Sequence, residues 1–174
     1  MQNTSLLFSA EQIGDRIGEL GRRLTSDYAG KDLLVLAVLN GAFLFAADLV
    51  RRIELPLAID FIRVASYGNA TCSSGRCTVS KDVELAISGK DVLLVEDIAD
   101  SGNTLAFLHR HLEQKEARSV RTCVLIDKHQ RRQRRVSIDY ACFQVAEGFL
   151  VGYGMDCAEK FRNLPAIYTL TERP

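Results

Sequence analysis

The chain has 174 residues, enough for one domain with a buried core and too few for two of ordinary size. Lys and Arg together number 22, as do Asp and Glu, so no overall field favours nucleic acid or an anionic membrane as a partner. No signal peptide is evident, and no apolar stretch approaches the roughly 18–20 residues that cross a bilayer. Any phosphate recognition is therefore expected to be local, built from loops and helix N-termini.

The five cysteines are spaced irregularly and include no Cys-x-x-Cys pair, which favours reduced thiols in a cytoplasmic protein. Cys123 and Cys142 stand in apolar runs that are typical of a core. Cys72 and Cys77 flank a polar Ser-Ser-Gly stretch, where a disulfide or a metal site is the less favoured alternative.

The first predicted element is a helix, because Ser9 can cap it, Gln12 stands three residues later, and apolar residues follow at helical spacing. Short apolar runs then alternate with helical segments. This alternation predicts an α/β protein with a mostly parallel central sheet and helices on both faces, where ligands lie beyond the carboxyl ends of the strands. The expected strands are Leu33–Leu39, Leu57–Ser66, Cys77–Leu85, Asp91–Val95, Ser119–Asp127, Ile138–Val145 and Ala166–Leu170, and the expected later helices are Ala42–Ile53 and Gly102–Gln114.

The segment from residue 92 to residue 105 carries the most specific chemistry. Four apolar residues form a buried strand, the acids Glu96 and Asp97 follow it, and Asp100 precedes a polar turn that opens a helix. A helix N-terminus presents unpaired N–H groups and the positive end of a dipole, so this turn suits a phosphate. Adjacent acids beside a polyphosphate suit Mg²⁺ or ribose hydroxyls. The residues of the turn are Ser101, Gly102, Asn103 and Thr104.

The plain alternative is that Asp100 or Ser101 only caps the helix. That alternative leaves Glu96 and Asp97 unexplained, since adjacent carboxylates repel each other without a cation. The same stretch resembles the phosphoribosyl diphosphate (PRPP) motif of type I phosphoribosyltransferases: four apolar residues, two acids, two variable residues, then acid, Ser or Thr, Gly, any residue and Thr. From Leu33 to Leu170 the chain resembles the hypoxanthine-guanine branch of that family.

The resemblance implies one phosphoribosyltransferase domain over residues 1–174, with a core at about 30–145 and a small base-binding hood from about 1–10 and 146–174. It implies purine salvage, with transfer of the phosphoribosyl group from PRPP to N9 of hypoxanthine or guanine to give IMP or GMP. Mg²⁺ is the implied cofactor. Because relatives form dimers and tetramers, a homodimer or homotetramer is expected.

Two loops resemble parts of the donor site. Leu39, Asn40 and Gly41 resemble the loop that carries a non-proline cis peptide and binds diphosphate through backbone N–H groups, although many relatives have Lys in place of Asn40. Ser66 and Tyr67 resemble the base of the lid, the loop that closes over the reaction and excludes water. An ordinary turn and a surface excursion are the plain alternatives.

The remaining implied roles concern the base and the metal. Lys128 resembles the lysine that donates to purine O6, Phe149 the ring that stacks on the base, and Leu150 the residue whose backbone meets the base edge. With Glu96 and Asp97, Asp156 is implied to hold Mg²⁺, and Arg162 to contact the diphosphate. A surface lysine, a core phenylalanine and a turn acid are the plain alternatives.

In the implied mechanism Asp100 is the general base that holds the N7 proton of the purine. Glu96 and Asp97 hold the ribose hydroxyls, directly or through Mg²⁺. Two alternatives stay open: a phosphoribosyltransferase for xanthine or a pyrimidine, and a nucleotide-sensing, nucleic-acid-binding regulator on the same fold. The zero net charge disfavours the regulator. The arginine-rich run 131–135 is interpreted as a solvated turn or a subunit contact.

Overall fold

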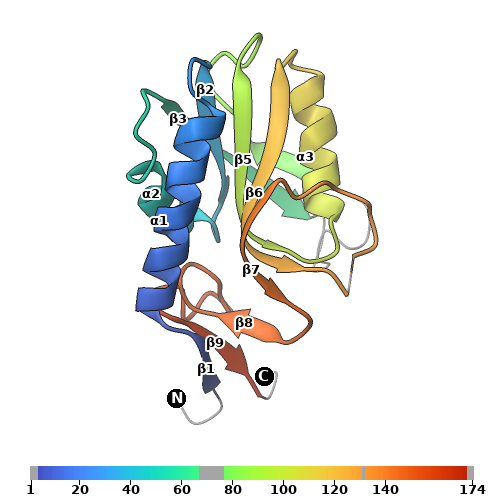
Figure 1. The fold of residues 1–174 in the computed structure, drawn as a ribbon. Helices are drawn as coiled ribbons and strands as arrows, with labels where there is room; N and C mark the ends of the chain where they lie inside the picture. Colours follow the sequence, from blue (N-terminus) through green and yellow to red (C-terminus); the bar gives the residue numbers. More distant parts are fainter. Residues whose placement is uncertain (1–3, 67–76, 131, 172–174) are drawn as a thin grey trace.

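The central sheet dominates the computed structural model, which describes residues 4–66, 77–130 and 132–171 (Figure 1). Within these residues it contains β2 (Leu33–Leu39), β3 (Ala58–Ser66), β4 (Cys77–Lys81), β5 (Asp91–Ala99), β6 (Ser119–Lys128) and β7 (Tyr140–Val145). The strands lie in the order β4-β3-β2-β5-β6-β7. Only the β3–β4 pair is antiparallel, so the predicted mostly parallel sheet is confirmed.

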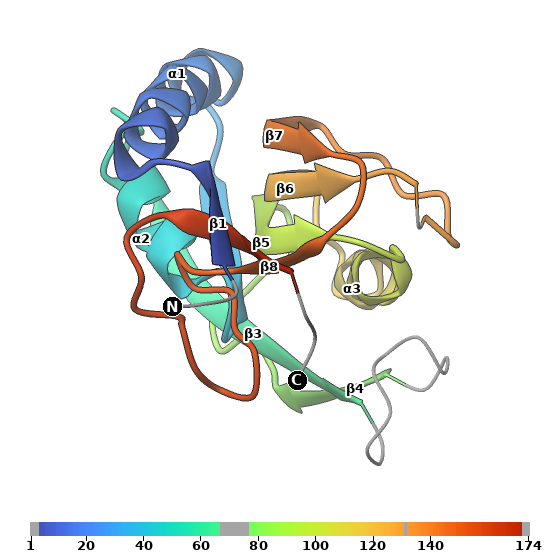
Figure 2. The ribbon, with the colours of Figure 1, turned by 90° about the horizontal axis from the view of Figure 1, so that it is seen from below.

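Helices cover both faces of this sheet, as the sequence predicted. The helices α1 (Ala10–Asp27) and α2 (Phe43–Val50) lie on one side and α3 (Asn103–Glu113) on the other (Figure 2). Since side chains alternate along a strand, Val35 and Leu93 join the cluster under α1 and α2, whereas Leu36 and Leu94 join the cluster under α3. Burial on both faces explains why β2 and β5 are continuous apolar runs.

The start of α1 confirms the expected capping box. The Gln12 N–H donates to Ser9 Oγ at 3.2 Å, and the Ser9 N–H donates to Gln12 Oε1 at 2.9 Å. These two bonds satisfy backbone donors that a helix N-terminus otherwise leaves unpaired.

A second, smaller sheet joins the two ends of the described chain. It consists of β1 (Thr4–Phe8), β8 (Phe149–Val151) and β9 (Ile167–Leu170) in the antiparallel order β1-β9-β8. It lies at the end of the central sheet where the parallel strands finish (Figure 1). We call this sheet, together with the connection from residue 152 to residue 166, the hood.

Several element boundaries differ from the sequence-based predictions. Strand β5 continues to Ala99, so Glu96 and Asp97 belong to the strand and do not follow it. The extension forms because β6 supplies ladder partners, with Glu96 opposite Val124 and Ala99 opposite Asp127. Helix α2 and strand β4 are shorter than expected. No helix in the described part of the chain is long and apolar enough to cross a membrane.

Candidate functional site

A cavity of about 220 Å³ lies at the end of β5, beside the N-terminus of α3. Its walls hold five of the residues that the sequence singled out, among them the two acids Glu96 and Asp100. The structure therefore brings together the strand end and the polar turn that the PRPP resemblance implied. The lining residues are Glu96, Ile98, Ala99, Asp100, Ser101, Gly102, Thr104 and Leu105.

The polar turn leaves the start of α3 open to a ligand. Gly102 is the N-cap residue, with a left-handed φ of 81°, and no side chain in the described part of the chain caps the helix. The contact of Ser101 Oγ with the Asn103 N–H is long, at 3.4 Å. Ser101 thus makes one long contact with the first amide of α3, and the role of the turn toward a phosphate stays a prediction. The amides of the first turn are those that a phosphate can accept from.

Glu96 lines this cavity with a buried carboxylate oxygen. Its Oε2 atom is buried and has no hydrogen-bond partner among the described residues. Burial, and then the negative charge of Asp97, raise the pKa of Glu96 well above its ordinary value. A buried polar atom of this kind is available to a hydrogen-bond donor from a ligand or water, because leaving it unpaired costs stability.

Asp97 faces the opposite side of β5 and meets the loop that follows β2. A Cβ atom added to Gly41 would lie 1.9 Å from Asp97 Oδ2, so a side chain at this position would have to displace the Asp97 carboxylate or the loop. A Cβ added to Gly154 would lie 2.1 Å from the Gly41 carbonyl oxygen. The loop is thus held between the acidic strand and the hood. Burial raises the pKa of Asp97 to about 6, with Arg162 opposing and Asp156 adding to the rise.

The same loop shows the backbone feature that the resemblance implied. The peptide bond between Leu39 and Asn40 is cis. Asn40 is exposed, and its side-chain role toward a ligand stays a prediction.

The hood contains an ion pair, between Arg162 and Asp156, near the loop that follows β2. Arg162 donates from Nη1 to the Gly154 carbonyl at 2.8 Å, and its Nη2 lies 2.8 Å from Asp156 Oδ1. Asp156 Oδ2 accepts the Glu159 N–H at 2.8 Å, so Asp156 is also the turn acid of the plain alternative. In the described residues no three His, Cys, Asp or Glu side chains gather closely enough to hold a metal by themselves. Glu96, Asp97 and Asp156 thus do not form a closed cage.

The residues that are predicted to bind the base lie where β6 ends and β8 begins. Lys128 is only 4% exposed, and its Nζ donates to the Gly148 carbonyl at 2.5 Å. The alternative of a solvated surface lysine is therefore wrong. Phe149 follows Gly148 and is half-buried, and Leu150 packs into the core. Lys128 thus binds, across the junction between the central sheet and the hood, the residue that precedes Phe149.

Sequence reasoning missed Arg132, which the structure places against the polar turn before α3. Its side chain is 17% exposed, its Nε donates to the Asp100 carbonyl at 3.2 Å, and it forms an ion pair with Asp127. The interpretation of 131–135 as a solvated turn is wrong for Arg132, while Arg135 is exposed as expected. The position of the arginine-rich run in the chain could have pointed to Arg132, because the run follows β6 at the edge where parallel sheets bind ligands.

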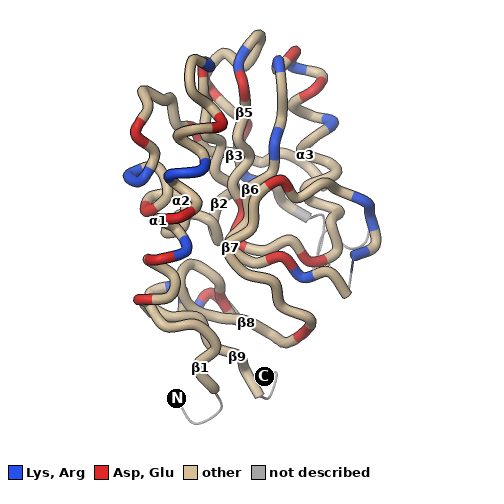
Figure 3. The backbone as a smooth tube through the Cα atoms, viewed as in Figure 1, with Lys and Arg blue, Asp and Glu red and all other residues tan. Residues whose placement is uncertain are grey.

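Acidic and basic residues are interspersed over the elements that Figure 3 draws.

The lid prediction is only partly covered by the described residues. Ser66 is the last residue of β3. Tyr67 and Cys72 lie outside the described residues.

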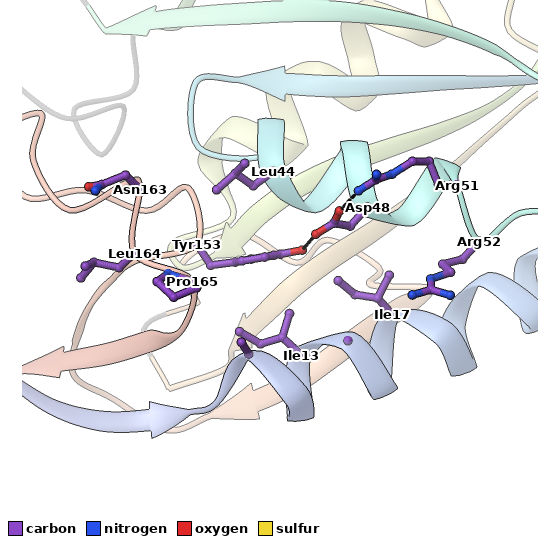
Figure 4. Close-up of a pocket in the computed structure, with 12 residues that line it drawn as sticks. Ile13, Ile17, Leu44, Asp48, Arg51, Arg52, Tyr153, Asn163, Leu164 and Pro165 are labelled. Carbon is purple, nitrogen blue, oxygen red and sulfur yellow. Dashed lines mark hydrogen bonds and ion pairs between the residues drawn. The ribbon is translucent and has the colours of Figure 1, made fainter.

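A second cavity, of about 580 Å³, lies between α1, α2 and the hood. Figure 4 shows Tyr153 pointing across it toward Asp48, whose carboxylate also pairs with Arg51. None of the predicted site residues lines this cavity. The Tyr153–Asp48 hydrogen bond instead connects the hood to α2.

Comparisons with known proteins agree with this geometry. The phosphoribosyl transferase domain model matches residues 4–158. The chain is 44% identical over 167 residues to a hypoxanthine-guanine phosphoribosyltransferase of Streptococcus thermophilus, covering 96% of this chain and 93% of the relative. It is 45% identical over 162 residues to the bifunctional protein TilS/HprT of Listeria innocua, covering 93% of this chain but 25% of that relative. The chain thus spans about a quarter of the bifunctional protein's length.

Solved structures show the same likeness. A hypoxanthine-guanine phosphoribosyltransferase from Bacillus anthracis superposes with a TM-score of 0.92 at 43% identity, covering 98% of this chain and 99% of the other. A hypoxanthine phosphoribosyltransferase from Staphylococcus aureus also gives a TM-score of 0.92, at 39% identity, covering 95% of this chain and 90% of the other.

Proposed function

The chain belongs to the phosphoribosyltransferase family, and on that premise we propose that it transfers the phosphoribosyl group of PRPP to N9 of hypoxanthine or guanine. The products are IMP or GMP and diphosphate, so the role is purine salvage. One observation carries the proposal: a buried lysine beside a hood phenylalanine lies at the same sheet edge as an acid-lined cavity over a helix N-terminus.

The turn from Asp100 to Thr104, which we call the phosphate turn, holds the 5′-phosphate of the donor. Gly102 lets the backbone approach closely, and the first amides of α3 donate to the phosphate oxygens. The hydroxyls of Ser101 and Thr104, both in the cavity wall, add neutral donors. This site needs no excess of basic residues, which fits a chain of zero net charge.

Glu96 and Asp97 hold the ribose and the diphosphate side of the donor from opposite faces of β5. Glu96 accepts from the ribose hydroxyls in the cavity, which gives its unpartnered Oε2 a donor. Asp97 stands against Gly41, so the backbone amides of residues 39–41 lie close to it for the diphosphate. Arg162, beside Asp97 and Asp156, supplies positive charge to the same group.

These acids fit Mg²⁺. Burial raises the pKa of both Glu96 and Asp97, and for Asp97 the Ile98 N–H and Arg162 oppose that rise only in part, so a cation beside these carboxylates would stabilise their charged forms. Mg²⁺ usually takes only one or two protein carboxylates and completes its shell with substrate phosphates and water. On its own face of β5, Asp97 would therefore suffice together with Asp156, the further oxygen donor that we predict, while Glu96 would supply an oxygen donor on the cavity side. Bound there, Mg²⁺ would neutralise charge on the departing diphosphate.

The base lies between Lys128 and Phe149. The Lys128 ammonium donates to O6, which suits a 6-oxopurine and disfavours the 6-amino group of adenine. Phe149 stacks on the ring, and the Leu150 backbone meets the base edge. Because Lys128 already binds the Gly148 carbonyl, its ammonium is aimed at the junction before the base arrives.

Asp100 acts as the general base for the N7 proton of the purine. As the C1–N9 bond forms and the C1–O bond to diphosphate breaks, the base loses its N7 proton, and Asp100 at the cavity wall accepts or holds it. The lid that begins near Ser66 is proposed to exclude water from the carbocation-like ribose.

We further propose a cytoplasmic homodimer or homotetramer. Cys123 and Cys142 are buried free thiols, as in proteins of reducing compartments. Light scattering on the purified protein measures its mass in solution, and a monomer at micromolar concentration would contradict the assembly.

A spectrophotometric panel of bases with PRPP, in Mg²⁺ or in chelator, tests the activity. We expect turnover of hypoxanthine and guanine in Mg²⁺, and little with adenine or uracil; xanthine, which also carries a 6-oxo group, tests the xanthine alternative. Turnover of neither hypoxanthine nor guanine would contradict the proposal. Filter binding to RNA and DNA at physiological salt tests the regulator alternative, for which tight binding without turnover is the signature.

A further inference from the structure

Arg132 contacts both halves of the site at once. We propose that it is a positioning residue that fixes the phosphate turn relative to the base-binding end of β6. The proposal rests on the proposed function, because it assigns Arg132 a role in that reaction without contact to the reacting atoms. Arg132 makes its contacts where the paired strands β5 and β6 end.

On the donor side, Arg132 binds the backbone that leads into the phosphate turn. Its Nε donates to the Asp100 carbonyl at 3.2 Å and its Nη2 to the Ala99 carbonyl at 3.3 Å. The β5–β6 register ends at the pair Ala99 and Asp127, so these bonds begin where the strand ladder stops. They fix the peptide that carries the Asp100 side chain.

On the base side, the same guanidinium binds the end of β6. Its Nη2 forms an ion pair with the Asp127 carboxylate and lies 3.4 Å from the Lys128 carbonyl. Asp127 is 15% exposed and Arg132 17%, so water screens this pair less than it screens a surface pair. The backbone of Lys128, the lysine aimed at O6, is thereby tied to the backbone of Asp100.

The residues after Arg132 extend this contact along the turn. The N–H groups of Gln133 and Arg134 donate to the Ser101 carbonyl at 2.9 and 3.1 Å. A Cβ added to Gly102 would lie 2.9 Å from Arg132 Cδ and 2.8 Å from the Arg134 carbonyl oxygen. The segment 132–134 therefore lies directly against the phosphate turn, and the Arg132 side chain holds it there through Asp100 and Asp127.

An arginine is needed for this geometry. A guanidinium has five N–H donors in a rigid plane, which lets one side chain reach carbonyls on two strands and a carboxylate together. A lysine at this position keeps the charge and the partnership with Asp127. It cannot hold the carbonyls of Ala99 and Asp100 at the same time.

The test compares Arg132→Lys with Arg135→Lys, a matched change at an exposed arginine of the same run. In the full-length protein with Mg²⁺, we expect Arg132→Lys to raise KM for both PRPP and hypoxanthine. It should lower kcat/KM by about tenfold or more, the usual effect of losing a charged hydrogen bond. Arg135→Lys should stay within about twofold of the unaltered protein, as surface changes usually do.

A purely structural role predicts a different result. It would lower the folded fraction, which reduces kcat and leaves both KM values unchanged, and that outcome would overturn the proposal. So would unchanged kinetics in Arg132→Lys. If Arg132→Lys folds poorly, Arg132→Ala is assayed with added guanidinium at concentrations far below denaturing ones. Restored activity with guanidinium, but not with methylammonium, supports the proposal, and no restoration overturns it.

Calorimetry adds a readout that does not need turnover. Arg132→Lys should bind ribose 5-phosphate, a probe of the phosphate turn and the ribose side of the cavity without the base, more weakly than Arg135→Lys does. Equal affinities in the two variants would overturn the proposal. Failure of the proposed function itself would be seen separately, as absence of base turnover by the unaltered protein.

Discussion

Gly41 and Asp97 are in such close contact that the loop after β2 has no room for a side chain: a Cβ at position 41 would lie 1.9 Å from Asp97 Oδ2. Gly14, on the exposed face of α1, has no atom within 4 Å of its own added Cβ. These two glycines therefore form a matched pair for testing the donor site.

We expect Gly41→Ala to displace either the loop or the Asp97 carboxylate, because overpacking of this kind costs about 1–3 kcal/mol. Its KM for PRPP should rise more than its KM for hypoxanthine. Gly14→Ala should keep full activity and gain up to about 1 kcal/mol from better helix propensity. Steady-state kinetics and thermal melts measure both. A Gly41→Ala protein with ordinary PRPP affinity would show that the loop does not bind the donor.

Asp100→Asn should lower turnover by about 10²–10⁴-fold, the usual contribution of general acid–base catalysis. Donor affinity should change little, because the phosphate turn uses backbone amides that an asparagine leaves in place. Single-turnover kinetics with PRPP and hypoxanthine, with product confirmed by chromatography, measure the chemical step. Unchanged turnover would remove Asp100 from the mechanism.

Lys128→Ala should weaken hypoxanthine binding by about 1.5–3 kcal/mol, the usual cost of a lost charged hydrogen bond. It should also relax discrimination against adenine. Because Lys128 Nζ binds the Gly148 carbonyl, the variant should loosen the start of β8 as well, visible as faster amide exchange there. Lys31→Ala, at an exposed lysine, is the control. Unaltered hypoxanthine affinity in Lys128→Ala would exclude the base-binding role.

Asp60 predicts a pH dependence of stability. Burial alone would raise the pKa of Asp60, but the N–H groups of Leu85, Phe61 and Glu84, together with Lys81, lower it. An aspartate whose pKa falls on folding stabilises the fold above its unfolded pKa of about 3.9. That contribution is lost as the pH falls through the folded value.

Urea unfolding of Asp60→Asn should therefore show a clear loss of stability at pH 7, and the gap from the unaltered protein should shrink below about pH 4. Asp32→Asn, at a carboxylate 59% exposed in its pair with Lys90, should change stability by less than about 1 kcal/mol. A gap for Asp60→Asn that stays constant between pH 7 and pH 3.5 would contradict this account.

The sequence predicted what local chemistry determines. The capping box of α1, the apolar strands β2 and β5 and the glycine-containing turn before α3 each follow from residues close together in the chain. The family resemblance added the cis peptide after Leu39, which no local pattern predicts.

The sequence did not predict what depends on neighbours distant in the chain. Strand β5 runs past its apolar residues because β6 pairs with it, and a single segment cannot show that partner. Arg132 looked like one of several solvated arginines, and it is distinguished only by the strand end on which it lies. The contact of Gly41 with Asp97 likewise exists only after β2 and β5 have paired.

The pairing of β1 with β9 has a consequence for biosynthesis. Thr4 lies opposite Leu170, so the first strand cannot find its partner until almost the whole described chain has left the ribosome. The central sheet ends at Val145, so all of its strands leave the ribosome before β9, which begins at Ile167. The nascent protein should therefore acquire a phosphate-binding surface before it can discriminate between bases. Ribosome-stalled chains that end before residue 166 should bind ribose 5-phosphate while failing to select a purine.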